Sequence, residues 1–199
     1  FEKAFKHAEH PFVAIFGGAK VEDKLDLIEN VMDKADTIII GGGMAYTFLQ
    51  AQGFNIGDSI VALNKIDDAK QILQRAKEKN IKILLPVDHV VLIKEKDKAK
   101  KTTELERGMV ALDIGPKTIN LFKEEILKAK QIIWNGPLGK YEDPRFKKGT
   151  MKIAKAVAKS GAYSVVGGGD SISAVKASGV AKYINHLSTG GGASLKLME

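Results

Sequence analysis

Short apolar runs alternate with amphipathic stretches along most of this 199-residue chain. Strands are predicted at 12–16, 37–40, 81–85, 131–134, 163–166 and 183–187, where apolar residues cluster between Gly, Pro or polar residues. Helices are predicted at 20–34, 44–50, 67–79, 117–128 and 145–159, and a further one from Ser171, where apolar residues recur at helical spacing. Alternation of this kind is typical of a parallel sheet covered by helices on both faces.

One stretch departs from the alternation. Residues 89–107 are polar and alternating, which predicts a small excursion containing a hairpin. The string ALDIGP at 111–116 resembles another turn at the end of a strand. No internal repeat and no linker is visible in the sequence, so we expect one domain.

Glycine runs follow several of the apolar stretches. Three Gly-Gly-Gly runs lie at 41–43, 167–169 and 190–192, and a Gly-Gly corner follows the first predicted strand. Glycine lets backbone N–H groups approach a bulky anion, and an adjacent helix N-terminus favours phosphate. Parallel sheets bind ligands at the carboxyl ends of their strands. The pattern therefore predicts a phosphorylated ligand along one edge of the sheet.

Composition and charge narrow the class of protein. The content is 44% hydrophobic and 28% charged, without cysteine, so disulfides and thiolate metal sites are excluded. The longest basic cluster, at 94–101, is interrupted by two acidic residues, and 7% aromatic residues offer little for base stacking. We expect a cytoplasmic, enzyme-like domain that binds neither nucleic acid nor a membrane, although the net charge of +7 leaves a basic nucleic-acid binder as an alternative.

Several common motifs are absent. There is no GxxxxGK[ST] string, no GxGxxG opening the first helix, no paired histidine spacing and no serine nucleophile elbow. Phosphate chemistry would have to rest on other residues.

Six side chains are candidates for binding such a ligand. Lys20 and Lys24 are four residues apart on the first predicted helix and would share a face, either as solvated lysines or directed at a polyanion. Asp170, before the helix predicted from Ser171, is either an N-cap or a carboxylate beside Mg²⁺ on a polyphosphate. Asn135 and Glu142, in the loop WNGPLGKYEDP, can accept hydrogen bonds from ribose hydroxyls, and Leu112 can wall an apolar slot for a base.

These strings resemble the phosphoglycerate kinase family. GGAKVEDK, IIIGGGMAYTFL, PVD, LDIGP, WNGPLGKYE, VVGGGDS and HLSTGGGASL follow that family's order and spacing over nearly the whole chain. The resemblance is to the C-terminal domain alone and implies a three-layer αβα, Rossmann-like sandwich with a six-stranded parallel sheet. It places the end of the interdomain helix at 1–11 and the nucleotide-binding domain at 12–199, without the N-terminal domain that binds 3-phosphoglycerate.

The resemblance also implies a function. The family is a glycolytic kinase that transfers a phosphoryl group between 1,3-bisphosphoglycerate and ADP, giving 3-phosphoglycerate and ATP with Mg²⁺. We expect this chain to be a monomeric fragment that binds adenine nucleotide without turnover, since the bisphosphoglycerate or 3-phosphoglycerate would need the N-terminal domain. A standalone adenine-nucleotide-binding module without catalysis is the alternative.

Carried over residue by residue, the resemblance assigns roles in the site. Asn135 and Glu142 would hold the ribose, Lys24 the nucleotide phosphates, Asp170 the Mg²⁺ with Ser171 beside it, and Lys20 the phosphoryl group in flight. The adenine slot would be lined by Gly18, Gly42, Gly43, Ala111 and Leu112. Backbone amides would come from Gly168, Gly169, Gly191 and Gly192. Two residues depart from the family's pattern: Lys140 replaces a small apolar residue, and Ala111 stands where glycine is common.

Overall fold

Six parallel strands form the central sheet of the computed structural model, which describes residues 8–188. The strands of this sheet are β1 (Phe12–Phe16), β2 (Thr37–Ile40), β3 (Lys82–Leu84), β7 (Gln131–Asn135), β8 (Tyr163–Gly167) and β9 (His186–Ser188). Their order is β3-β2-β1-β7-β8-β9, and every neighbouring pair is parallel. The predicted six-stranded parallel sheet is confirmed.

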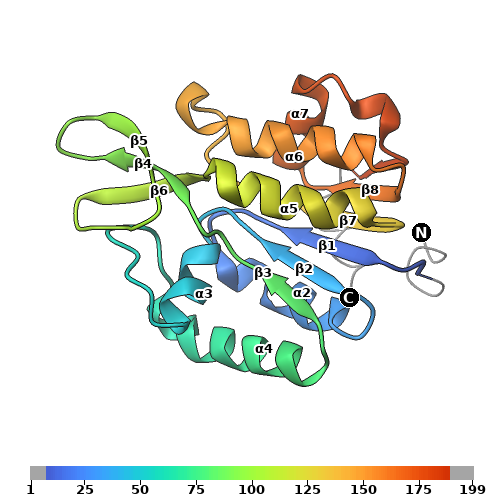
Figure 1. Ribbon diagram of the computed structural model, residues 1–199, viewed down its shortest axis with the longest axis horizontal. Coiled ribbons are helices and arrows are strands. Elements are labelled where there is room, and N and C mark those ends of the chain that lie inside the picture. The colour runs from blue at the N-terminus through green and yellow to red at the C-terminus, as the bar shows by residue number, and fades with distance from the viewer. Residues whose placement is uncertain (1–7, 189–199) are drawn as a thin grey trace.

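Helices cover both faces of the sheet (Figure 1). One face carries α2 (Leu25–Val31), α3 (Ala45–Ala51) and α4 (Ile66–Glu78), and the other carries α5 (Pro116–Lys128), α6 (Lys148–Lys159) and α7 (Gly169–Ala177). The short 3-10 turns are η1 (Val21–Asp23), η2 (Leu63–Lys65), η3 (Pro144–Phe146) and η4 (Ala181–Tyr183). The architecture is therefore the expected three-layer sandwich.

The central strand β1 shows why both faces need a cover. All five of its residues are buried, and side chains alternate between the faces of a strand. Phe12, Ala14 and Phe16 belong to the core shared with α2, α3 and α4. Val13 and Ile15 belong to the second core, with α5, α6 and α7. An uninterrupted apolar run is thus what a strand between two helical layers requires.

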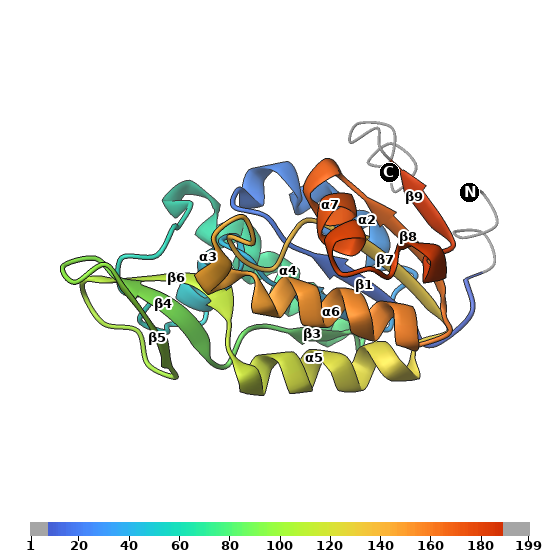
Figure 2. The ribbon, with the colours of Figure 1, turned by 90° about the horizontal axis from the view of Figure 1, so that it is seen from above.

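A second, antiparallel sheet extends beyond one end of the main sheet (Figures 1 and 2). It consists of β4 (His89–Ile93), β5 (Lys98–Thr102) and β6 (Met109–Ile114), in the order β5-β4-β6. The predicted hairpin is confirmed as β4 and β5. The prediction of a strand-end turn at 111–116 was wrong for its first part, because residues 111–114 belong to strand β6, which pairs with β4.

The buried Asp88 joins the two sheets to α5. Its carboxylate accepts hydrogen bonds from the Lys117 N–H at 2.9 Å, the Thr118 N–H at 2.8 Å and the Thr118 hydroxyl at 2.6 Å. These N–H groups belong to the first turn of α5, which has no side-chain cap on its own N-cap residue, Gly115. Asp88 therefore fixes where α5 begins, directly after β6.

Other predicted elements also differ from the structure. The predicted helix 20–34 is divided into η1 and α2, and Lys24 lies between them. The strand predicted at 183–187 starts only at His186, since Tyr183 ends the turn η4. The described part of the predicted interdomain helix, residues 8–11, contains no helix, and residues 1–7 lie outside the described range. Among residues 8–188, no helix has the length and apolar character needed to span a membrane.

Candidate functional site at the sheet switch point

The strand order reverses between β1 and β7, the place where open α/β sheets bind ligands. There the turn after β1 meets the loop after β7 backbone to backbone. The Gly17 N–H donates to the Asn135 carbonyl at 2.9 Å, and the Gly18 N–H donates to the Pro137 carbonyl at 2.9 Å. A Cβ on Gly136 would lie 2.2 Å from the Gly17 oxygen. Glycine at position 136 therefore allows these two loops to pack backbone to backbone.

The turn after β2 joins the same cluster. The Met44 N–H donates to the Gly18 carbonyl at 3.0 Å. Gly42 has a φ of +69°, and a Cβ there would lie 2.7 Å from the Gly18 nitrogen. Three strand ends are therefore held within contact of one another, and they form the floor of a pocket.

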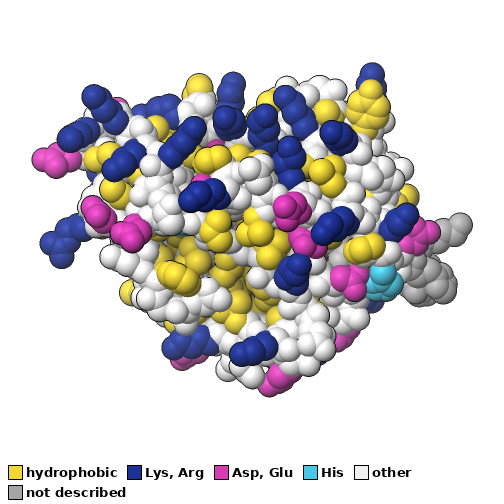
Figure 3. All heavy atoms as spheres, in the orientation of Figure 1, with side chains coloured by type: hydrophobic (Ala, Val, Ile, Leu, Met, Phe, Trp, Pro, Cys, Tyr) yellow, Lys and Arg dark blue, Asp and Glu magenta, His cyan; other side chains and the backbone are white. Residues whose placement is uncertain are grey.

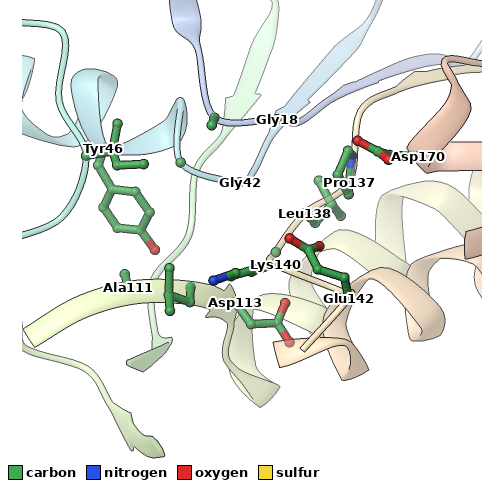
Figure 4. Close-up of a pocket in the computed structure, with 15 residues that line it drawn as sticks. Gly18, Gly42, Tyr46, Ala111, Asp113, Pro137, Leu138, Lys140, Glu142 and Asp170 are labelled. Atoms are coloured by element: carbon green, nitrogen blue, oxygen red, sulfur yellow. The ribbon is translucent and has the colours of Figure 1, made fainter. Parts of the chain in front are cut away.

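The pocket has a volume of about 400 Å³ and lies between these turns and strand β6 (Figure 4). Its walls come from the turns after β1 and β2, from α3, β6, the loop after β7 and the start of α7. The lining residues are Gly18, Ala19, Gly42, Gly43, Tyr46, Ile60, Ala111, Leu112, Asp113, Pro137, Leu138, Gly139, Lys140, Glu142 and Asp170. The size suits a small-molecule ligand.

Seven residues to which the family resemblance assigns a site role line this pocket. They are Gly18, Gly42, Gly43, Ala111, Leu112, Glu142 and Asp170. They come from five separate segments of the chain, so only the fold brings them together. The residues Lys20, Lys24, Asn135, Gly168, Gly169 and Ser171 do not line it. Gly191 and Gly192 lie outside the described residues.

The start of α7 differs from the sequence prediction. The helix begins at Gly169 with Gly168 as its N-cap, so Asp170 lies in the first turn and is not the capping residue. Its exposed carboxylate lies at the wall of the pocket, beside first-turn N–H groups that have no partner inside the helix. Ser171 is buried, and its hydroxyl accepts from the Gly136 N–H at 2.7 Å. Ser171 thus fastens α7 to the loop after β7.

Lys20 and Lys24 do not share a helix face, contrary to the sequence prediction. Lys20 is exposed and has an extended backbone before η1. Lys24 is half-buried, and its ammonium group donates to the buried side-chain oxygen of Asn135. Burial lowers the pKa of Lys24, and the nearby Asp23 opposes that shift. The two lysines therefore differ in exposure and in partners.

Tyr46 and His89 form a buried pair that sequence reasoning missed. The Tyr46 hydroxyl and the His89 Nδ1 are 2.7 Å apart, and both residues are buried. Burial raises the pKa of Tyr46 and lowers that of His89 to about 4, so both are neutral at pH 7. Tyr46 lies in the string GGGMAYTF, but its spacing alone indicates only a helix core position.

Asp113 is the second missed residue of the pocket. Its carboxylate accepts from the Gly149 N–H and from the Ile114 N–H, each at 2.9 Å. Burial raises its pKa to about 7, although these two hydrogen bonds oppose the shift. A Cβ on Gly139 would lie 2.5 Å from this carboxylate. Asp113 therefore positions the wall formed by the loop after β7 and the start of α6.

Lys140, which departs from the family's pattern, lines the pocket (Figure 4). Its backbone N–H donates to the Leu112 carbonyl at 2.8 Å, which ties its loop to β6. In Figure 4 its amine points toward β6, and the carboxylates of Glu142 and Asp170 lie nearer the opposite end of the pocket. The pocket thus runs from Tyr46 and an apolar wall toward the acidic start of α7.

The fold and this pocket define an α/β sandwich of the doubly wound class with a ligand-sized cavity at its switch point. Comparison with known proteins gives the family. The profile of the phosphoglycerate kinase family matches residues 1–199. The phosphoglycerate kinase of Koribacter versatilis is 56% identical and that of Clostridium perfringens strain SM101 is 51% identical. The alignments cover 99% and 98% of this chain and 50% of either relative.

Solved structures agree. Phosphoglycerate kinase from Coxiella burnetii matches with a TM-score of 0.95 at 40% identity, over 99% of this chain and 52% of that one. The enzyme from Pyrococcus horikoshii OT3 matches with a TM-score of 0.88 at 33% identity, over 99% and 51%. The chain belongs to the phosphoglycerate kinase family, and it spans about half the length of the relatives that it matches.

Proposed function

We propose that this chain is the adenine-nucleotide-binding, C-terminal half of a cytoplasmic phosphoglycerate kinase. In that role it holds ADP or ATP while a phosphoryl group passes between the nucleotide and the carboxyl group of 3-phosphoglycerate. The observation that carries the proposal is the pocket at the switch point. It joins seven of the residues that the family resemblance assigns to the nucleotide.

The polarity of the pocket supports one orientation of the nucleotide. Tyr46, Ala111 and Leu112 offer an apolar slot of the kind that a base occupies. Asp170 and the first-turn N–H groups of α7 lie toward the other end (Figure 4). A helix N-terminus favours phosphate, since its unpaired N–H groups and its dipole both attract anions. The base therefore enters beside α3 and β6, and the phosphates extend toward α7.

The donor set fits Mg²⁺ carried on a polyphosphate. Magnesium is usually held by one or two carboxylates together with phosphate oxygens and water. Within residues 8–188 no group of three His, Asp or Glu side chains could hold a metal alone, whereas Asp170 offers one exposed carboxylate at the phosphate end. When bound, the ion would neutralise charge on the phosphates. Lys24 would add a positive charge from the β1 side.

Chemical-shift mapping tests the placement. Adding Mg-ADP to ¹⁵N-labelled protein should move the amide signals of Gly18, Gly43, Leu112 and Asp170, and should leave those of α4 in place. Signals that move only on α4, or on the hairpin β4–β5, would show that the nucleotide binds elsewhere and would overturn the assignment.

A further inference from the structure

A second cavity, of about 700 Å³, lies on the other side of the Tyr46–His89 pair. Tyr46 lines the switch-point pocket and His89 lines the second cavity, so this buried pair separates the two. The second cavity is bounded by the end of α3, the segment from β3 to β4, and residues 103–106 after β5. Its volume lies in the range of small-molecule sites.

The walls of the second cavity are largely apolar. Leu49, Leu85 and Leu105 are buried in its walls, while Phe54 and Val87 are 58% and 48% exposed. Hydrophobic side chains gather on this face over α3 and β3 (Figure 3). Large apolar side chains left open to water around a concave site are typical of a binding surface.

The charge of the lining is opposite to that of the protein. Glu104 and Glu106 are the charged residues of the cavity, and among residues 8–188 no lysine or arginine lines it. Both carboxylates are exposed, and neither takes part in an ion pair within the described part of the chain. In a protein of net charge +7, an apolar cavity edged by carboxylates selects against anions.

We propose that this cavity is a binding site for small amphiphilic amines. The aromatic or aliphatic body enters between Phe54, Val87 and the three buried leucines, and the ammonium group faces Glu104 and Glu106. A nucleotide is a poor occupant, because its phosphates would meet these two carboxylates. The site is therefore distinct in chemistry from the switch-point pocket and does not depend on the function proposed for that pocket.

Three probes with one ring system test the proposal. Titration of ¹⁵N-labelled protein with 1-naphthylmethylamine should move the signals of residues 49–55, 85–89 and 103–106. 1-Naphthylmethanol should bind more weakly, and 1-naphthoate weaker still, with at least about a threefold difference in affinity between amine and carboxylate. No localised shifts at millimolar amine, or shifts confined to Gly18, Leu112 and Asp170, would overturn the proposal.

Matched variants separate the contribution of charge to probe binding from that of apolar contact. The double change Glu104→Gln and Glu106→Gln should remove the preference for the amine. Glu95→Gln with Glu124→Gln, which alters net charge equally at exposed positions elsewhere, should keep it. Phe54→Ala should weaken all three probes, whereas Leu63→Ala, at a side chain 75% exposed outside the cavity, should not. An unchanged preference in the double variant would contradict the ammonium site.

A second copy of the chain is the competing occupant. If a second copy occupies the cavity, sedimentation at increasing protein concentration should show a dimer, and Phe54→Ala should disrupt that dimer. Such a dimer, in place of amine binding, would overturn the proposal. A monomer that binds the amine supports it.

Discussion

Lys24 and Lys20 lie in different surroundings, and this difference predicts unequal roles. Lys24 is half-buried against Asn135, whereas Lys20 is exposed. We expect Lys24→Ala to weaken Mg-ADP binding by about one to two decades, the value of a lost charge-assisted hydrogen bond, and Lys20→Ala to weaken it less. Titration calorimetry measures the Mg-ADP affinity of both variants. Lys159→Ala, at an exposed position of α6, is the control. Equal losses, or a larger loss at Lys20, would contradict the assignment.

Asp170 should act through magnesium and not through the nucleotide alone. Its carboxylate would repel phosphates unless a cation lies between them, so Asp170→Asn should have different effects on ADP affinity with and without Mg²⁺. With Mg²⁺ present, we expect ADP affinity to fall about tenfold. In excess EDTA, affinity should stay equal or rise. The exposed Asp67→Asn is the control. A tenfold loss that persists in EDTA would show that Asp170 does not act through the metal.

Asp113 and His89 predict opposing pH dependences of stability. The pKa of Asp113 rises from 3.8 to about 7, so its contribution is full below pH 4 and is lost as the pH rises through 7. The pKa of His89 falls from 6.5 to about 4, so its contribution is full above pH 6.5 and is lost as the pH falls through 4. Between pH 4 and 6.5 the two therefore oppose each other.

Single variants separate the two contributions to the pH dependence of stability. Over this window Asp113→Asn should leave a stability that increases with pH, and His89→Gln one that decreases with pH. Urea unfolding at several pH values measures the free energy of unfolding. If Asp113→Asn has the same slope as the wild type, the carboxyl does not titrate with a raised pKa.

At the scale of elements, the contact between the turn after β1 and the loop after β7 sets the floor of the pocket. Gly136 has a φ of +101°, and an added Cβ would lie 2.2 Å from the Gly17 oxygen. We expect Gly136→Ala to lower the free energy of unfolding by about 2 kcal/mol or more. Gly161 also has a positive φ, of +71°, but a Cβ added there would meet no atom within 4 Å.

The Gly161→Ala variant is the matched control for Gly136→Ala. This variant carries the conformational cost of a positive φ without the clash, so we expect it to lower the free energy of unfolding by about 1 kcal/mol. Chemical denaturation of both variants gives the difference. Equal losses would mean that the loops can separate at little cost, and the floor of the pocket would then not be rigid.

Elements with a strong local pattern could be predicted from the sequence. Phe12–Phe16 and Thr37–Ile40 are uninterrupted apolar runs, and both strands have the predicted bounds. Strand β6 could not be predicted in full, because its pairing with β4 depends on contacts distant in sequence. The helix predicted at 20–34 failed for a local reason: η1 and α2 have different hydrogen-bond periods and meet at Lys24.

Some residues that line the candidate pocket could be predicted, because glycine or charge distinguishes them in the sequence. Gly42, Glu142 and Asp170 stand in strings with an evident chemistry, and all three line the pocket. Tyr46 and Asp113 were missed because their shifted pKa values depend on burial, which the sequence does not show. The sequence predicts a helical tyrosine and an aspartate in a strand-end turn. Burial in the folded chain raises both pKa values, and Asp113 and Asp88 add to the shift of Tyr46.

At the scale of the whole molecule, we expect the purified 199-residue chain to show no phosphoglycerate kinase turnover. It spans about half the length of its relatives, and phosphoryl transfer needs donor and acceptor held in line. Positioning of this kind contributes about 7–11 kcal/mol to lowering a barrier. A coupled assay with bisphosphoglycerate and Mg-ADP measures turnover by the purified chain. ATP formation at an ordinary kinase rate would show that this half holds both substrates.

The central claim is that the switch-point pocket binds adenine nucleotide, and calorimetric titration of the folded chain with Mg-ADP tests it most directly. Circular dichroism first establishes that the protein is folded. We predict saturable heat for one nucleotide per chain, reduced by Lys24→Ala and, in the presence of Mg²⁺, by Asp170→Asn. The absence of both heat and a thermal shift at millimolar Mg-ADP, in folded protein, would contradict the account.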